Sequence, residues 1–266
     1  MYRSRLIQKK KNGLHEIQSY YCWINLYDQI KIKRVKNKDK ISFYGPFKKL
    51  INDKNNSVIN LLKILRKQKL ISNYYHISVT KNIPVFGGLG GGTSNAAFIL
   101  KYLFKNKIKK DLLKKLKSVI GSDLHLFFKK QGFLKNLRNI IELKNKQTFY
   151  FALIYPKIKC STEEVYSDVK KFSKKEQLDK KLTNSKGKFI DYLSKSRNDL
   201  QFIVEKKYPS VKRILIDIKK MEGCYFSRMT GSGSVCYGLF RDKYVAKKAL
   251  NKLKNKYPKY WFTLAK

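Results

Sequence analysis

The chain has 266 residues, of which 61 are Lys or Arg and 18 are Asp or Glu, so its formal net charge at pH 7 is +43. This length is sufficient to bury a core in one large domain or two smaller ones. The chain has no apolar run near the ~18 residues that cross a bilayer, and its basic N-terminus lacks the apolar core of a signal peptide. We therefore expect a cytoplasmic protein that has no membrane partner.

The positive charge has two explanations. It favours a polyanion such as nucleic acid as a partner. However, only nine of the 61 basic residues are Arg, and the abundant Lys, Asn, Ile, Tyr and Phe share A/T-rich codons. Genomic base composition could therefore produce the same profile, and the spread of lysines along the whole chain favours this second explanation. An RNA-binding protein stays an alternative, although no RRM or KH signature is present.

The four cysteines form no CxxC pair, and the three histidines are scattered along the chain. Such spacing is typical of isolated thiols in a reducing compartment. We predict no residue that ligates a metal.

The expected elements, in chain order, form a mixed pattern. Strands are expected within 16–44 and over 75–80, 148–155 and 235–240, with helices over 57–70, from 96 onward, over 111–120, and near 190–205 and 209–221. The lysine-rich stretch 170–188 is expected to be a surface loop. The elements do not alternate as in a doubly wound parallel sheet, so the pattern predicts an α+β fold whose two halves meet near residue 150.

Residues 84–97 read PVFGGLGGGTSNAA, with five glycines in six positions. An alternating segment precedes them and a helical pattern follows, with Thr93, Ser94 or Asn95 available as the N-cap. Glycine permits positive φ and close approach of the backbone, and a helix N-terminus attracts anions. The unit therefore predicts a phosphate-binding loop. It lacks the lysine of a Walker loop, and Thr93 stands where a Rossmann fingerprint needs a third Gly or Ala.

This loop resembles that of the galactokinase, homoserine, mevalonate and phosphomevalonate (GHMP) kinases. Within that superfamily, its GLGGGxSNAA form resembles the 4-diphosphocytidyl-2-C-methyl-D-erythritol kinase family. Further segments resemble this family in the same order along nearly the whole chain: Gly13-Leu14-His15-Glu16, Gly121-Ser122-Asp123-Leu124, Asn198-Asp199-Leu200 and Met229-Thr230-Gly231-Ser232-Gly233.

The resemblance implies a two-domain GHMP kinase fold, with a ribosomal S5-like N-terminal domain over 1–147 and a ferredoxin-like C-terminal domain over 148–266. It implies ATP-dependent phosphorylation of the 2-hydroxyl of 4-diphosphocytidyl-2-C-methyl-D-erythritol, in the non-mevalonate route to isoprenoids. The expected cofactors are ATP and Mg2+. The expected partner is a small-molecule substrate, with no nucleic acid, and the chain is expected to be a monomer or homodimer. Kinases of the homoserine or mevalonate type remain an alternative.

The resemblance also implies the roles of particular residues. Asp123 would be the general base, His15 would hydrogen-bond the cytosine and Tyr166 would stack on it. Gly231, Ser232 and Gly233 would close the substrate site. ATP would be bound by Pro84, Gly87, Gly88, Leu89, Gly90, Gly91, Gly92, Thr93, Ser94 and Asn95, with Thr93 and Ser94 assisting a magnesium-bound oxygen.

The chain departs from the family pattern at several places. Leu14 replaces a tyrosine that would stack on cytosine, Phe86 stands where a small residue is usual, and His125 replaces a proline. The family's opening strand carries Lys-x-Asn-Leu, with its lysine about sixteen residues before the histidine, which falls ahead of Met1. We therefore expect an N-terminal truncation that removes the first strand and this lysine, through a start assigned too late, with a degenerate enzyme as the alternative.

Overall fold

The computed structural model describes residues 4–10, 13, 15–179 and 181–266, which fold into two compact units. Unit 1 consists of the residues up to Asn25, the short stretch Phe86–Leu89 and Lys130–Lys266. Unit 2 consists of Leu26–Val85 and Gly90–Lys129. The glycine-rich stretch is therefore shared between the units, with Phe86–Leu89 in unit 1 and the residues from Gly90 onward in unit 2.

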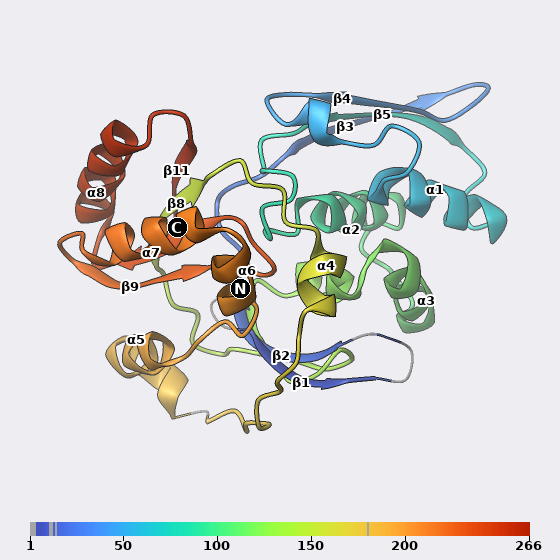
Figure 1. Ribbon diagram of the computed structural model, residues 1–266. Coiled ribbons are helices and arrows are strands. Elements are labelled where there is room, and N and C mark those ends of the chain that lie inside the picture. Colours follow the sequence, from blue (N-terminus) through green and yellow to red (C-terminus); the bar gives the residue numbers. More distant parts are fainter. Residues whose placement is uncertain (1–3, 11–12, 14, 180) are drawn as a thin grey trace. The chain divides into compact units, whose positions relative to one another are not determined.

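Unit 2 has one three-stranded sheet with helices on one of its faces (Figure 1). Its strands lie in the order β3 (Gln29–Val35), β5 (Tyr74–Thr80) and β4 (Lys40–Tyr44), with β3 antiparallel and β4 parallel to β5. The helices are α1 (Ser57–Lys67), α2 (Gly91–Leu103) and α3 (Lys110–Ile120), and the shorter 3-10 segments are Lys48–Leu50 and Ser122–Phe128.

Alternation in β5 explains this packing, because Tyr75, Ile77 and Val79 all point into the core. Helix α1 contributes Leu61 and Leu65 to the same cluster, together with buried residues of α2 and α3. The core of unit 2 thus holds the middle of α2 in the same cluster as the buried face of β5.

Unit 1 contains two four-stranded sheets. The first has the order β1 (Arg5–Lys9), β2 (His15–Cys22), β6 (Gln131–Leu134) and β7 (Ile140–Glu142), and the second has the order β11 (Trp261–Ala265), β8 (Tyr150–Tyr155), β10 (Cys236–Phe240) and β9 (Cys224–Met229). Its helices are α4 (Thr162–Ser167), α5 (Lys186–Lys195), α6 (Gln201–Lys207), α7 (Pro209–Lys219) and α8 (Lys243–Lys256), with a 3-10 turn at Leu182–Asn184.

Helices α7 and α8 pack along the second sheet (Figure 1), and their buried residues Ile214 and Leu250 join Ile154 of β8 in one core cluster. None of the described helices combines the length and the apolar character that crossing a membrane requires.

The expected α+β mixture is confirmed, but two local predictions are wrong. Helix α2 begins at Gly91 with Gly90 as its N-cap, so Thr93, Ser94 and Asn95 lie inside the helix. The helix expected near 190–205 is divided into α5 and α6, because the intervening segment carries Asn198, whose side chain bonds other backbone groups. The domain boundary between residues 147 and 148 stays a prediction.

Candidate functional site

The N-terminus of α2 is built to receive an anion. Gly90 adopts the left-handed conformation with a φ of 70°, and no side chain caps the helix. The first N–H groups of an α-helix have no partner within the helix, and the helix dipole adds partial positive charge there. The observed start at Gly91 therefore leaves the amides of the first turn available to a phosphate, which a side-chain cap would have occupied.

The backbone at Gly91 lies close to the end of β5. A Cβ at this position would lie 2.9 Å from Ile83 Cγ2 and 3.3 Å from Lys81 Nζ. Gly91 does not have positive φ, so glycine is required here by close packing. The predicted residue Pro84 is buried just beyond Ile83.

A buried ion pair between Lys81 and Asp28 supports the contact between Gly91 and the end of β5. Asp28 also accepts hydrogen bonds from the Ile83 N–H at 2.9 Å and from the Asn95 side-chain amide at 3.0 Å. Burial lowers the pKa of Lys81, and the neighbouring Asp28 carboxylate opposes that shift. Asn95, predicted as a nucleotide contact, thus anchors α2 to the carboxylate that organises the end of β5. Sequence reasoning missed Lys81 and Asp28, which are separated by 53 positions.

Thr93 and Ser94 have different surroundings. The Ser94 side chain is buried, and its hydroxyl donates to the Gly91 carbonyl at 2.8 Å. Thr93 is half-buried, and its Oγ1 lies 3.5 Å from where a Cβ on Gly121 would be. Thr93 therefore faces the turn that carries Asp123, and it fits the predicted role near a metal-bound phosphate oxygen better than Ser94 does.

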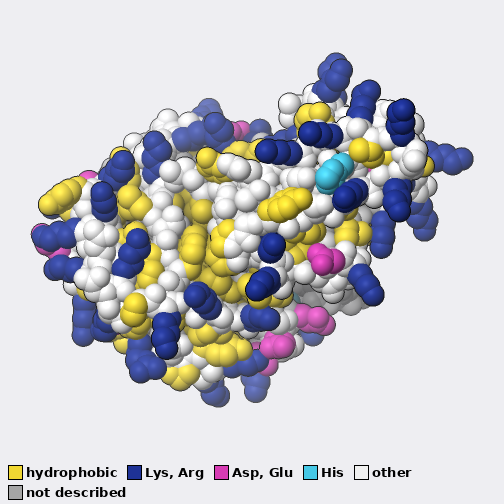
Figure 2. Space-filling view, turned by 90° about the horizontal axis from the view of Figure 1, so that it is seen from above, with side chains coloured by type: hydrophobic (Ala, Val, Ile, Leu, Met, Phe, Trp, Pro, Cys, Tyr) yellow, Lys and Arg dark blue, Asp and Glu magenta, His cyan; other side chains and the backbone are white. Residues whose placement is uncertain are grey.

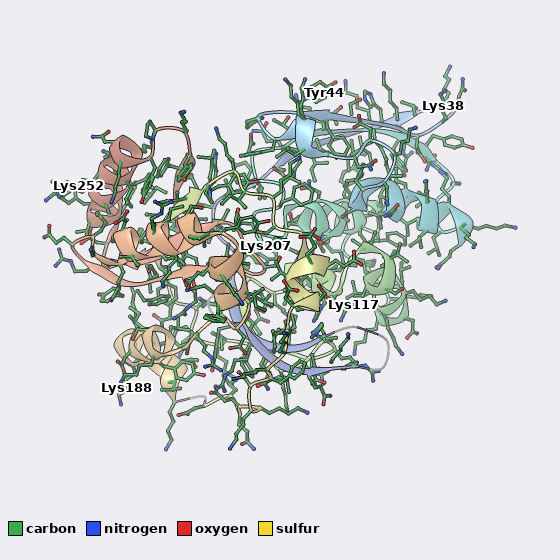
Figure 3. All side chains as sticks on the ribbon, in the orientation of Figure 1. Lys38, Tyr44, Lys117, Lys188, Lys207 and Lys252 are labelled. Carbon is green, nitrogen blue, oxygen red and sulfur yellow. The ribbon has the colours of Figure 1, made fainter. Side chains whose placement is uncertain are left out.

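Asp123 lies in the 3-10 segment Ser122–Phe128, directly after α3. Desolvation raises the pKa of its carboxyl group, and the Ser122 hydroxyl, 3.4 Å from Oδ1, and the nearby charge of Lys117 oppose that rise. Lys117 belongs to the last turn of α3 (Figure 3). A partly desolvated carboxylate with a raised pKa is a suitable general base, because it binds a proton more strongly than an exposed one.

His125 is buried in the same segment, and neither ring nitrogen has a hydrogen-bond partner among the described residues. Burial and the charge of Lys117 lower its pKa to about 4. The imidazole is therefore neutral in the folded protein near pH 7.

Replacing His125 with Leu should make the free energy of unfolding less sensitive to acid. A histidine with a pKa of 6.5 when unfolded and about 4 when folded is neutral in both states well above pH 6.5 and imposes no cost on the native state there. Between pH 6.5 and 4, protonation favours the unfolded state, which should cost about 3 kcal/mol by pH 4. Urea unfolding of the parent and of His125→Leu at pH 7.5, 6, 5 and 4 measures this difference. Asp123 acts in the opposite direction but is common to both proteins. If the free energy of unfolding had the same pH dependence in both proteins, the lowered pKa of His125 would be disproved.

In unit 1, Phe86–Gly88 pair with the loop between β9 and β10. The N–H of Ser234 donates to the Phe86 carbonyl at 3.2 Å, and that of Val235 donates to the Gly87 carbonyl at 3.2 Å. The Thr230 hydroxyl donates to the Gly88 carbonyl at 3.1 Å. A Cβ on Gly88 would lie 2.2 Å from the Thr230 carbonyl oxygen, so only glycine permits this approach. Phe86 itself has a φ of 59° and an exposed side chain, which explains why a small residue is usual there.

The predicted residues Gly231, Ser232 and Gly233 lie in the middle of this loop, and all three are buried. Buried Asn198 donates to the carbonyls of Met229 at 2.9 Å and Gly231 at 2.8 Å. Ser232 Oγ lies 3.0 Å from Thr162 Oγ1. Asn198 of the Asn-Asp-Leu segment therefore fixes the shape of the loop between β9 and β10. Leu89, the last residue of the stretch in unit 1, is half-buried.

Three aromatic rings meet at the start of β2. The His15 ring lies 5.1 Å from Tyr166 and 6.1 Å from Phe172 between centroids, and it is nearly parallel to Phe172 at 23°. His15 is buried, and its Nε2 has no hydrogen-bond partner among the described residues, whereas Phe172 is 44% exposed. Burial and nearby Lys9 lower the pKa of His15. This arrangement suits a planar ring that carries a hydrogen-bonding edge. Leu14 lies outside the described residues.

The prediction of widely spread lysines concerns the surface, and the prediction of isolated thiols concerns the four cysteines. Figure 2 shows Lys and Arg side chains spread over the face in view, with few Asp and Glu among them. None of the four cysteines forms a disulfide with another described residue, and burial raises the pKa of the Cys160 and Cys224 thiols to about 11. Within the described residues, no group of three or more His, Cys, Asp or Glu side chains could hold a metal ion.

Comparisons with known proteins agree with this arrangement. Residues 56–127 match the GHMP kinases N terminal domain, and residues 176–259 match GHMP kinases C terminal. The chain is 38% identical over 258 residues to 4-diphosphocytidyl-2-C-methyl-D-erythritol kinase of Pelagibacter ubique (strain HTCC1062), covering 95% of this chain and 90% of the relative. It is 31% identical to the Prochlorococcus marinus (strain AS9601) protein of the same name, covering 92% of this chain and 84% of the relative.

Solved structures have the same fold. A crystal structure of 4-(cytidine 5'-diphospho)-2C-methyl-D-erythritol kinase matches with a TM-score of 0.74 at 19% identity, covering 99% of this chain and 95% of the other. Homoserine kinase from Cytophaga hutchinsonii matches with a TM-score of 0.61 at 16% identity, covering 94% and 87%. At such identities the structural matches establish the fold, whereas the closer sequence relatives establish the family. The chain belongs to the 4-diphosphocytidyl-2-C-methyl-D-erythritol kinase family of the GHMP kinases.

Proposed function

We propose that this protein transfers the terminal phosphoryl group of ATP to the 2-hydroxyl of 4-diphosphocytidyl-2-C-methyl-D-erythritol, in the non-mevalonate route to isoprenoid precursors. The observation that carries this proposal is the 38% identity to a relative of that name over 95% of the chain. The acid–base and anion-binding residues described above are those that phosphoryl transfer requires.

In unit 2, the first turn of α2 binds the ATP phosphates, and Asp123 takes the proton from the acceptor hydroxyl as that oxygen attacks phosphorus. The uncapped helix start and the left-handed Gly90 fit a phosphate cradle. Mg2+ neutralises phosphate charge when it is bound, and Thr93, which faces the Asp123 turn, is the protein hydroxyl assigned to assist it.

In unit 1, we assign recognition of the cytosine to His15, Tyr166 and Phe172. The unpartnered Nε2 of His15 supplies the hydrogen bond, and the aromatic rings supply stacking surfaces. The loop from Gly231 to Gly233, held by Asn198, closes the substrate site. Phe172 lies in the stretch expected to be a surface loop, and its role was not anticipated from the sequence.

The other candidate functions have weaker support. The likeness to homoserine kinase is one of fold at 16% identity. The spread of lysines along the whole chain favours genomic base composition over a nucleic-acid site. We also infer that the protein acts in the cytoplasm, as a monomer or homodimer.

The proposal is tested by incubating the protein with ATP, Mg2+ and 4-diphosphocytidyl-2-C-methyl-D-erythritol, and by following ADP release and the phosphorylated product by mass spectrometry. Parallel reactions receive homoserine or mevalonate as the acceptor. Turnover of the cytidine compound alone is expected. Turnover of only homoserine or mevalonate would contradict the substrate assignment, and salt-sensitive RNA binding without kinase activity would contradict the reaction class.

Replacing Phe172 with Ala should raise the KM for the cytidine substrate about fivefold, with the KM for ATP unchanged. Base–aromatic stacking contributes about 1–3 kcal/mol, and a ring that is 44% exposed should lie near the lower limit. Phe172→Tyr keeps the stacking face and should behave like the parent. Steady-state kinetics of both variants give the two constants.

Phe202→Ala is the matched control, since this phenylalanine of α6 is 74% exposed and lies on the same unit. It should leave both KM values unchanged. A Phe172→Ala enzyme with the parent's KM for the cytidine substrate would remove Phe172 from base recognition.

A further inference from the structure

Lys101, in the last turn of α2, directs its ammonium group toward the protein. Its Nζ donates to the Phe127 carbonyl at 2.6 Å and lies 4.5 Å and 4.9 Å from the ring centroids of Phe98 and Phe128. Burial lowers the pKa of this lysine, whereas most lysines of the chain are exposed. Through its contacts with Phe127 and Phe128, Lys101 holds the 3-10 segment to which these two residues belong.

Phe127 lies near the end of the 3-10 segment that carries Asp123. The last carbonyl groups of a helical segment lack partners within it and carry partial negative charge, so a cation binds them well. Two aromatic faces add cation–π attraction. An apolar residue at position 101 could fill the same space, but it would not bond the Phe127 carbonyl.

The same segment lies close to α2 at both of its ends. At Gly121, just before the segment, the Thr93 hydroxyl lies 3.5 Å from where a Cβ would be. Near the segment's end, the Phe127 ring lies 3.0 Å from where a Cβ on the N-cap residue Gly90 would be, and Lys101 binds the Phe127 carbonyl. Helix α2 therefore provides both the amides of the phosphate cradle and the supports of the Asp123 segment. Among the α2 residues that support the segment, Lys101 is the one that carries a charge.

We propose that Lys101 is a positioning residue for phosphoryl transfer, which holds the Asp123 segment against α2 so that the carboxylate keeps a fixed place relative to the phosphate-binding turn. This rests on the proposed function of Asp123 as general base. Lys101 acts through Phe127 and does not touch the substrate. Misplacing a catalytic group by a small distance lowers the rate of the chemical step more than it weakens binding.

Lys101→Met should lower kcat about tenfold and leave the KM values for ATP and the cytidine substrate within twofold of the parent. The KM values persist because the phosphate cradle consists of the backbone of α2 itself. Lys101→Arg keeps the cation and should recover kcat to within threefold of the parent. Lys115→Met is the matched control on the exposed side of α3 and should be neutral.

Thermal unfolding of each variant establishes that kcat refers to folded enzyme. Hydrogen exchange of the amides of residues 121–129, followed by mass spectrometry, tests the same inference without turnover. Lys101→Met should exchange faster in this segment and not in β5. If Lys101→Met fails to fold, Lys101→Gln takes its place with the same expectations.

Each result tests either the positioning role of Lys101 or the proposed function. A Lys101→Met enzyme that melts at lower temperature but keeps kcat within twofold, or that shows parent-like exchange over 121–129, would overturn the positioning role while the function stands. A parent enzyme without turnover would overturn the proposed function, and the exchange measurement would then decide whether Lys101 holds the segment.

Discussion

Asp123→Asn is expected to lower kcat by about 10²–10⁴-fold while substrate binding is largely kept, because an amide of similar size cannot accept the proton of the acceptor hydroxyl. The raised pKa of Asp123 adds a second expectation. Since the base must be deprotonated, kcat of the parent should fall with decreasing pH at a value above the ordinary 3.8 of an aspartate. Steady-state ADP release as a function of pH measures both effects.

Asp111→Asn is the control for this substitution, because Asp111 is exposed in the first turn of α3. It should keep the parent's kcat and pH profile. If Asp123→Asn stayed within threefold of the parent, Asp123 would have no part in proton transfer.

Gly90→Val should weaken ATP binding about 100-fold. Gly90 has a φ of 70° and caps α2, and the left-handed conformation costs an ordinary residue about 1–2 kcal/mol. The new side chain would also strike the Phe127 ring, since a Cβ would lie only 3.0 Å from it. Overpacking of this kind costs about 1–3 kcal/mol. In the free variant the loop can relieve these costs by leaving the left-handed conformation, and ATP binding must then restore that conformation. A cost that approaches about 3 kcal/mol is thereby taken from binding, which is two factors of ten in the dissociation constant.

Isothermal titration of the folded variants with ATP measures this effect. Gly90→Ala has the same backbone strain with a smaller side chain, so it should show an intermediate loss. Gly187→Val serves as the control, because a Cβ there meets only Ser185 Oγ at 4.0 Å. A folded Gly90→Val protein with the parent's affinity would mean that this loop does not bind the nucleotide.

The features that could be predicted from the sequence are those encoded in short stretches. The glycine loop, the alternation of β5 and the helix over 111–120 each depend on a few neighbouring residues. The predicted start of α2 was wrong for a local reason. Three hydroxyl or amide residues in a row indicated a side-chain cap, but Gly90 in its left-handed conformation starts the helix earlier.

The features that escaped prediction join residues far apart in the chain. Asp28 and Lys81 form their buried pair across 53 positions, and either residue alone looks like a surface charge. Phe172 occupies a lysine-rich stretch without periodicity, so nothing local indicated that its ring lies beside His15. Asn198 belonged to a recognised segment, but its bonds to the loop at Gly231 depend on the folded backbone.

The division of the glycine stretch between the two units limits how this protein can be recombined with its relatives. Residues 26–129 resemble an insertion that could be exchanged as a cassette, except that Phe86–Leu89 fold with unit 1. A chimera that imports this cassette still supplies backbone carbonyls to Ser234, Val235 and Thr230, but it also replaces Gly88, whose missing side chain permits the approach of the Thr230 carbonyl. Exchange should therefore succeed only with a donor that has glycine at the position of Gly88.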